Sequence, residues 1–285
     1  MDIAKQTFDI AVASEMLNNK KRTGIMTRRL FVSVACIVCL CTFSAGSAQA
    51  EAKGIIVSAA ISLKNAFEEI GKLYESSHEG AKVSFNFGAS GDLMLQIEGG
   101  APVDVFAPAA QKDMDKAEKK GLIEPGSRKD FTANAVVLVI PAKSKKLIKS
   151  FSDLPSGEIK KIAIGNPRTV PAGRYAEEIF RYCRVYDAIK GKLIFAENVR
   201  QALDYVGREE VDAGVIYLSD ARIKATDVKV AAVAPSGSHK PVIYPISVIK
   251  GTKHPDLSKE FIAVVTSEEG QAILRKYGFG TVTGK

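Results

Sequence analysis

The sequence has no tryptophan, three histidines and four cysteines in 285 residues. The histidines, His78, His239 and His254, fall in predicted loops without the spacing of a metal site. No apolar run approaches the roughly 20 residues of a membrane span. No carboxylate pair suggests general acid and base catalysis, and no basic stripe with interleaved aromatics suggests nucleic-acid binding. What is left is a globular composition, 46% hydrophobic and 25% charged, long enough for two domains.

Residues 1–50 differ from the rest and are predicted to be a leader. Met26 stands directly before Arg28 and Arg29, an apolar stretch over 30–45 and a small-residue ending over 46–50. These are the three parts of a secretory signal peptide. We expect translation to start at Met26, cleavage after Ala50 and an exported, soluble product. General secretion is favoured, with twin-arginine export as the alternative.

The leader also accounts for most of the cysteines and part of the charge. Cys36, Cys39 and Cys41 lie within it, so the mature chain keeps Cys183 alone and no intrachain disulfide is expected. Residues 1–50 hold six of the 40 Lys and Arg and three of the 32 Asp and Glu, which lowers the net charge from +8 to +5. This surplus is too mild to indicate a nucleic-acid partner.

From residue 54 onward, short apolar strands alternate with amphipathic helices. Strands are predicted over 55–57, 83–87, 103–107, 135–140, 162–164, 193–195, 214–217, 228–233 and 242–249. Helices are predicted from 62 onward and over 92–98, 111–120, 172–184, 199–209, 257–265 and 268–277. The βα series implies parallel sheets in two α/β lobes joined by two extended crossings. Lobe 1 is assigned to 51–133 and 240–285, where the last two helices return, and lobe 2 to 134–239.

Small donor residues recur where a helix follows a strand. Ser62 and Ser90 occupy two successive positions of this kind in the first lobe, and glycines around Ser90 would let a ligand approach the backbone. Either serine could be only a helix cap. Two of them at neighbouring strand ends, where open α/β sheets bind ligands, make a binding role as probable as capping.

The second lobe repeats the arrangement with backbone amides. Pro171 begins a predicted helix and leaves the amides at and after Ala172 without intrahelical acceptors, and Val199 opens the next helix. Free helix starts favour anions. Four such starts from two lobes could surround one small oxyanion without a lysine or arginine in the pocket.

Seven segments follow one another over essentially all of 54–280: Ser62–Phe67, Phe87–Leu93, Gly100–Phe106, Val170–Ala176, Asn198–Leu203, Gly214–Tyr217 and Arg275–Phe279. In sequence and order they resemble the ModA-type periplasmic molybdate-binding proteins. The Val-Pro-Ala-Gly-x-Tyr and Gly-Val-x-Tyr segments together are specific, whereas Gly100–Phe106 is similar to many solute-binding proteins.

The resemblance implies a type II periplasmic-binding-protein fold that closes on molybdate or tungstate and delivers it to the membrane permease of an ABC importer. It implies a periplasmic binding protein without catalytic residues or cofactor, and we expect a monomer. Carried over by position, the ligand contacts are Ser62, Ser90, the amides of Ala172 and Val199, and the Tyr217 hydroxyl. Gly91 and Asp92 depart from the family, which often has Ser and Thr there.

The chemistry of these groups agrees with the family. A fully deprotonated tetrahedral dianion has only acceptors, so hydroxyls, amides and a phenol suit it, whereas phosphate still carries a proton at neutral pH. Sulfate differs in size, and molybdate and tungstate are nearly equal. The alternatives are a same-fold binding protein for sulfate, an organic anion or an iron–anion pair, or an exported enzyme acting on an anionic substrate.

Simpler structural roles are available to three further side chains and to Tyr217 itself. Asp104 is expected to be a loop or cap acceptor, and Tyr217 alone could be a half-buried core residue. Arg168 and Arg174 lie near the second-lobe segment but are expected to be solvated, with at most a role in long-range steering of anions.

Overall fold

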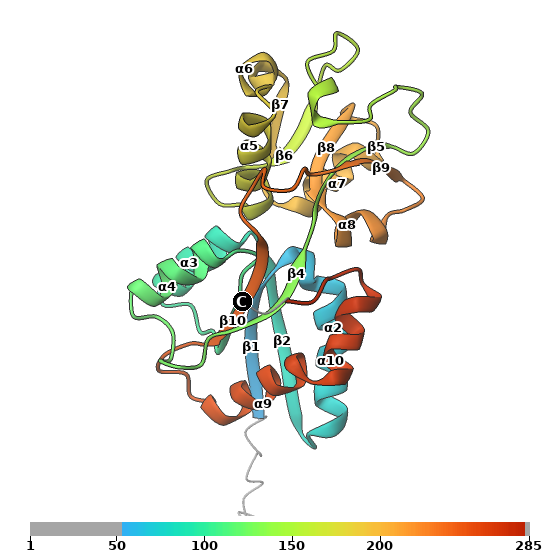
Figure 1. The fold of residues 1–285 in the computed structure, drawn as a ribbon. Coiled ribbons are helices and arrows are strands. Elements are labelled where there is room, and N and C mark those ends of the chain that lie inside the picture. Colours follow the sequence, from blue (N-terminus) through green and yellow to red (C-terminus); the bar gives the residue numbers. More distant parts are fainter. Residues whose placement is uncertain (1–52, 283–285) are drawn as a thin grey trace, which may run out of the picture. The chain divides into compact units, whose positions relative to one another are not determined.

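The computed structural model describes residues 53–282, which form two mixed α/β sheets flanked by helices (Figure 1). The predicted leader, its three cysteines and the cleavage position after Ala50 lie outside the described residues. No helix within the described residues is long and apolar enough to cross a membrane.

The first sheet contains five strands drawn from both ends of the described chain. In spatial order they are β2 (Ala81–Gly88), β1 (Lys53–Ala60), β3 (Val105–Ala107), β10 (Val242–Val248) and β4 (Lys129–Asn134). β1 is parallel to β2 and β3, as the βα pattern predicts, but β10 is antiparallel to both β3 and β4. The sheet is therefore mixed rather than purely parallel.

The helices of the first lobe cover this sheet on two sides. They are the 3-10 turn η1 (Ile61–Leu63), α2 (Lys64–Ser77), α3 (Ser90–Glu98), α4 (Gln111–Lys119), α9 (Pro255–Thr266) and α10 (Glu268–Lys276). Figure 1 shows α3 and α4 on one side and α2 and α10 on the other. Both C-terminal helices pack against α2, so they do return to the first lobe as predicted. Phe67 of α2 and Phe261 of α9 meet edge to face, with ring centroids 5.9 Å apart.

The second sheet is built from one continuous stretch of chain. Its order is β7 (Leu193–Ala196), β6 (Ile162–Gly165), β8 (Ala213–Tyr217), β5 (Val136–Pro141) and β9 (Val228–Val233). Parallel strands β7, β6 and β8 form one half, and β5 lies antiparallel to β8 and β9. The helices of this lobe are η2 (Phe151–Asp153), α5 (Pro171–Tyr182), α6 (Tyr186–Ile189), η3 (Lys190–Lys192), α7 (Val199–Gly207) and α8 (Leu218–Ile223).

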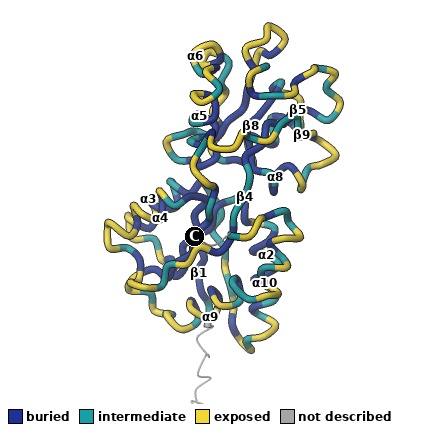
Figure 2. Tube along the Cα trace, viewed as in Figure 1, coloured by how far each residue is buried: buried dark blue, intermediate teal, exposed yellow. Residues whose placement is uncertain are grey.

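Burial follows the strands. Figure 2 shows buried segments running through both sheets, while the outer parts of the helices and loops are exposed. All six residues of β5 are buried, which fits its uninterrupted apolar sequence.

Two crossings connect the lobes and run next to each other. The chain passes directly from β4 to β5 between Asn134 and Ala135, and it returns from β9 to β10 through 234–241. The Ala234 amide donates to the Val136 carbonyl oxygen at 2.9 Å, which ties the two crossings together. Hinges in proteins are a few loop or element-terminal residues of this kind that absorb a change in φ and ψ.

Candidate functional site

Both serines predicted as ligands lie at the carboxyl ends of strands in the first sheet. Ser62 follows β1 and Ser90 follows β2, and these strands are parallel, so their carboxyl ends meet. Each serine is only 1% exposed. This edge, at the carboxyl ends of parallel strands, is where open α/β sheets bind ligands.

Neither serine is a helix cap, so the simpler alternative is wrong for both. The residues that precede η1 and α3 are Ala60 and Ala89. The Ser90 Oγ instead accepts a hydrogen bond from the Ala109 amide at 2.9 Å. Because the backbone amide is the donor, the proton of the Ser90 hydroxyl remains available for another acceptor.

Two helix starts in the second lobe present backbone amides at the carboxyl ends of β6 and β7. In α5, which begins at Pro171, the amides of Gly173 and Arg174 donate to the Val170 carbonyl oxygen at 3.1 and 3.3 Å, whereas the Ala172 amide has no acceptor among residues 53–282. The first amides of a helix have no intrahelical acceptor, so Ala172 needs a partner from elsewhere.

The start of α7 has the same property. Asn198 is the N-cap, and its Oδ1 accepts from the amides of Arg200 and Gln201 at 3.0 Å each. The Val199 amide, at the first position of the helix, does not donate to the Asn198 side chain. Val199 is 3% exposed, so its amide lies in the protein interior.

Tyr217 ends β8 and carries an unpaired polar atom. Its side chain is 1% exposed, and its hydroxyl oxygen is buried with no hydrogen-bond partner among residues 53–282. Burial raises the pKa of this phenol well above its usual range, so the group keeps its proton and remains a donor. An unsatisfied buried hydroxyl costs about 1–3 kcal/mol, which favours a position where a ligand supplies the acceptor.

Direct contacts bring these elements of the two lobes together. The Gly91 amide at the start of α3 donates to the Thr169 carbonyl oxygen, just before α5, at 2.9 Å. Nη2 of Arg200, next to Val199, donates to the Ser62 carbonyl oxygen at 3.5 Å. These two contacts join the starts of α3 and η1 in the first lobe to the starts of α5 and α7 in the second, and we call this junction between the lobes the cleft.

Tyr244 contacts both Ser62 and Tyr217, although its sequence context predicts only that it lies within an apolar strand. Its hydroxyl is 3.0 Å from the Ser62 Oγ, and its ring centroid is 5.9 Å from that of Tyr217. It therefore connects the predicted Ser62 contact with the predicted Tyr217 contact.

The arginines at the cleft are neutralised by carboxylates. Arg174 pairs with Asp113 of α4, across the two lobes, and Arg200 pairs through Nε with Asp220. Burial raises the pKa of both carboxyls, and the adjacent guanidinium offsets part of this effect. Each of these two guanidinium groups therefore has a carboxylate partner that offsets its charge.

The prediction that Arg174 is solvated is wrong. Its side chain is only 14% exposed, because the Asp113 carboxylate holds it in the interface between the lobes. The partner comes from 61 residues earlier in the chain, which local sequence does not reveal. Arg168 is exposed, as predicted.

The structure explains why Asp104, Gly91 and Asp92 occupy their positions. Asp104 accepts from the Ile56 amide at 2.7 Å through Oδ2 and from the Thr252 hydroxyl through Oδ1, which confirms its predicted role as an acceptor. A Cβ at Gly91 would lie 2.8 Å from the Thr169 Cα, so glycine is needed for the lobes to approach this closely. Asp92 lies in the first turn of α3, where a carboxylate favours the free helix amides.

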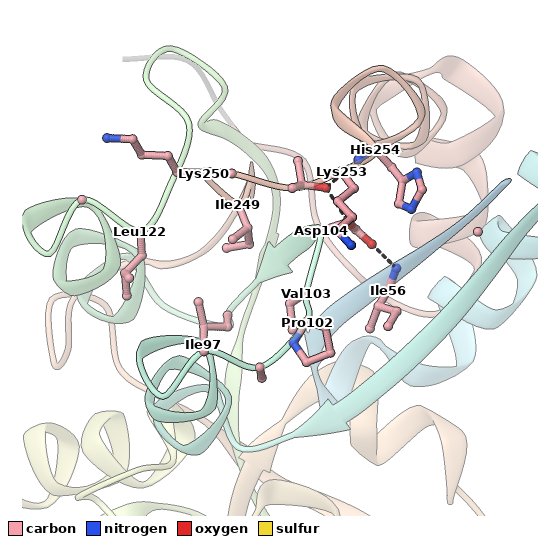
Figure 3. Close-up of a pocket in the computed structure, with 16 residues that line it drawn as sticks. Ile56, Ile97, Pro102, Val103, Asp104, Leu122, Ile249, Lys250, Lys253 and His254 are labelled. Carbon is pink, nitrogen blue, oxygen red and sulfur yellow. Dashed lines mark hydrogen bonds between the residues drawn. The ribbon is translucent and has the colours of Figure 1, made fainter. Parts of the chain in front are cut away.

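A cavity of about 460 Å³ lies elsewhere in the first lobe (Figure 3). Apolar residues such as Ile56, Leu122 and Ile249 line it, and Lys250 lies at its rim. It opens at the amino ends of β1 and β3, at the opposite end of the strands from Ser62 and Ser90, so it is distinct from the cleft.

No group of three or more His, Cys, Asp or Glu that could hold a metal ion occurs among residues 53–282.

Comparison with known proteins shows the family and the fold of the chain. A family model described as bacterial extracellular solute-binding protein matches residues 55–280. The molybdate-binding protein ModA of Escherichia coli is 37% identical, over 82% of this chain and 92% of its own length. ModA of Haemophilus influenzae is 36% identical, over 79% and 89%. The solved periplasmic molybdate-binding protein of Azotobacter vinelandii is similar in fold, with a TM-score of 0.72 at 22% identity, over 81% of this chain and 100% of its own.

Proposed function

The chain belongs to the bacterial extracellular solute-binding protein family, and from this membership and the geometry of the cleft we propose that it captures molybdate or tungstate between its lobes. It then delivers the anion to the membrane permease of an ABC importer. The names of the ModA relatives describe molybdate-binding proteins, and the donors at the cleft suit such a ligand.

The observation that carries the proposal is the buried Tyr217 hydroxyl without a partner among the described residues. It is a donor, and the proposed contact set adds the hydroxyls of Ser62 and Ser90 and the amides of Ala172 and Val199. A fully deprotonated tetrahedral dianion offers only acceptors, so every one of these groups can be satisfied at once. A protonated oxyanion would leave its own proton facing donors, which costs affinity.

The proposal has three further parts. The lobes divide into 51–133 with 240–285 and 134–239, so that they rotate about the two crossings. The protein is a noncatalytic monomer exported to the periplasm, with its leader cleaved after Ala50. Closure is favoured by the ligand because each lobe supplies part of the anion's contacts, and those contacts are complete only in the closed state.

Titration calorimetry of the mature chain with molybdate, tungstate, sulfate and phosphate tests the ligand. We expect molybdate and tungstate to bind with similar affinity and both to bind more tightly than sulfate or phosphate. Sulfate has the same charge and shape and differs in size, so it is the critical competitor. Tightest binding to sulfate or phosphate, or no binding of molybdate, would contradict the proposal.

A further inference from the structure

Tyr244 is a buried tyrosine of β10 whose hydroxyl lies beside a proposed ligand contact. Its side chain is fully buried, and its ring packs edge-on against Phe279 and Phe131 at centroid distances of 5.6 and 6.4 Å. The hydroxyl is 3.0 Å from the Ser62 Oγ and 3.3 Å from the Asn134 Nδ2. Packing therefore fixes the ring, and two polar neighbours fix its hydroxyl.

The orientation of the Asn134 amide follows from its other contacts. One side-chain atom lies 2.9 Å from the amide nitrogen of Ala135, and a backbone N–H can only donate. That atom must be the oxygen, so the Nδ2 faces the other way. Nδ2 then donates to the Tyr244 hydroxyl oxygen and, at 2.8 Å, to the Ser219 Oγ.

This orientation bears on the next hydrogen bond, in which either hydroxyl could be the donor. The Tyr244 oxygen already accepts from Asn134, and a phenol donates more readily and accepts less readily than an aliphatic hydroxyl, so donation from Tyr244 to the Ser62 Oγ is favoured. Burial raises the pKa of Tyr244, so the phenol stays protonated at neutral pH.

Ser62 is thereby left with a proton to donate. Its Oγ accepts from Tyr244, and no acceptor for its own proton is found among residues 53–282. One of its two lone pairs is already used, and the hydroxyl proton is the group that remains to face the cleft.

We infer that Tyr244 is a positioning residue that commits the Ser62 hydroxyl to donate toward the ligand, and thereby favours oxyanions that carry no proton. The inference rests on the proposed function, because it takes Ser62 as a ligand contact. It adds a residue outside the predicted contact set and a physical basis for rejecting protonated anions.

A double-mutant cycle tests this role. The variants are Tyr244→Phe, Ser62→Ala and the double variant, with Tyr74→Phe as the matched control. Tyr74 is also a buried tyrosine, but its hydroxyl donates to the Leu257 carbonyl oxygen at 3.3 Å in the first lobe. Titration calorimetry measures dissociation constants for molybdate and for inorganic phosphate, and thermal unfolding checks that every variant is folded.

The Tyr244→Phe substitution should weaken molybdate binding by about fivefold to tenfold, the value of one hydrogen bond, while Tyr74→Phe leaves it unchanged. In the Ser62→Ala background the same substitution should have almost no further effect, because Tyr244 acts through Ser62. The preference for molybdate over phosphate should also fall in Tyr244→Phe, since the Ser62 oxygen regains a lone pair that can accept a phosphate proton.

The outcomes separate the inference from the proposed function. Equal losses from Tyr244→Phe in both backgrounds, or an unchanged preference over phosphate, overturn the role of Tyr244 and leave the proposed function intact. Wild-type protein that binds sulfate instead of molybdate overturns the proposed ligand, and the cycle is then measured with sulfate. Wild-type protein that binds none of these anions overturns both.

Discussion

Replacing Arg174 with methionine is expected to weaken molybdate binding by about 100-fold. The substitution replaces the aliphatic part of the side chain but leaves the Asp113 carboxylate, 8% exposed in its side chain, without its partner across the cleft. Removing one member of a buried ion pair costs about 3–5 kcal/mol. Because Arg174 itself is 14% exposed, we take the lower value, about 3 kcal/mol, which equals about two decades in affinity.

The Arg174→Met substitution should weaken closure of the lobes and should not lower the stability of the fold. When the lobes separate, Asp113 can be hydrated, so the penalty for the isolated carboxylate is confined to the closed state. Titration calorimetry gives the dissociation constant, and small-angle X-ray scattering with saturating molybdate shows whether the lobes still close. Thermal unfolding of the ligand-free variant should stay close to that of the wild type.

A second substitution distinguishes lost charge pairing from lost packing. The double variant Asp113→Leu with Arg174→Met removes both charges, and replacing a buried pair by apolar residues is often nearly neutral. We expect its affinity to return to within about tenfold of the wild type. Wild-type affinity in Arg174→Met alone, or equal defects in the single and double variants, would refute the reasoning.

The pH dependence gives an independent check on Asp113. Burial raises the pKa of this carboxyl, and Arg174 offsets part of the rise. Without Arg174 the closed-state pKa rises further, so the closed state binds a proton more tightly than the open state does. The affinity defect of Arg174→Met should therefore shrink as pH falls from about 7.5 toward about 5.5. A constant defect would point to packing instead.

Three other substitutions examine the proposed contacts, with affinity measured by calorimetry. Ser90→Ala should cost roughly 1.5–3 kcal/mol, or about one to two decades, and unchanged affinity would remove Ser90 from the contact set. Tyr217→Phe should lower affinity by about tenfold or more without destabilising the ligand-free protein, since its hydroxyl has no partner among the described residues. Gly91→Ala should impair closure because its Cβ would lie 2.8 Å from the Thr169 backbone; normal affinity and scattering would contradict that contact.

Much of the fold could be predicted because its elements have clear local patterns. The apolar runs gave β5 and β8 within a residue or two, and Pro171 marked the first residue of α5. β4 was not predicted, since its sequence Lys-Asp-Phe-Thr-Ala-Asn has neither an apolar run nor strict alternation. It forms a strand because β10 pairs with it, which is a long-range effect.

For the site as well, local sequence predicted the residues at strand ends but not the long-range contacts. Ser62, Ser90 and Tyr217 stood out because each follows or ends a strand, a property that local sequence shows. The role of Tyr244 depends on Ser62, 182 residues away, and that of Arg174 depends on Asp113. Pairings over such distances are set by the topology of the sheets and not by spacing in the sequence.

The position of β10 in the first sheet also sets the order in which the chain can assemble. β10 lies between β3 and β4, so that sheet stays divided until residues 242–248 are available, whereas the second sheet needs only residues 136–233. As the chain is synthesised, the second lobe can complete its hydrogen bonds first, and the first lobe is finished only when residues 242–276 have been made. Loss of the C-terminal segment would thus leave the first lobe with open strand edges, although the segment that begins that lobe is made earliest.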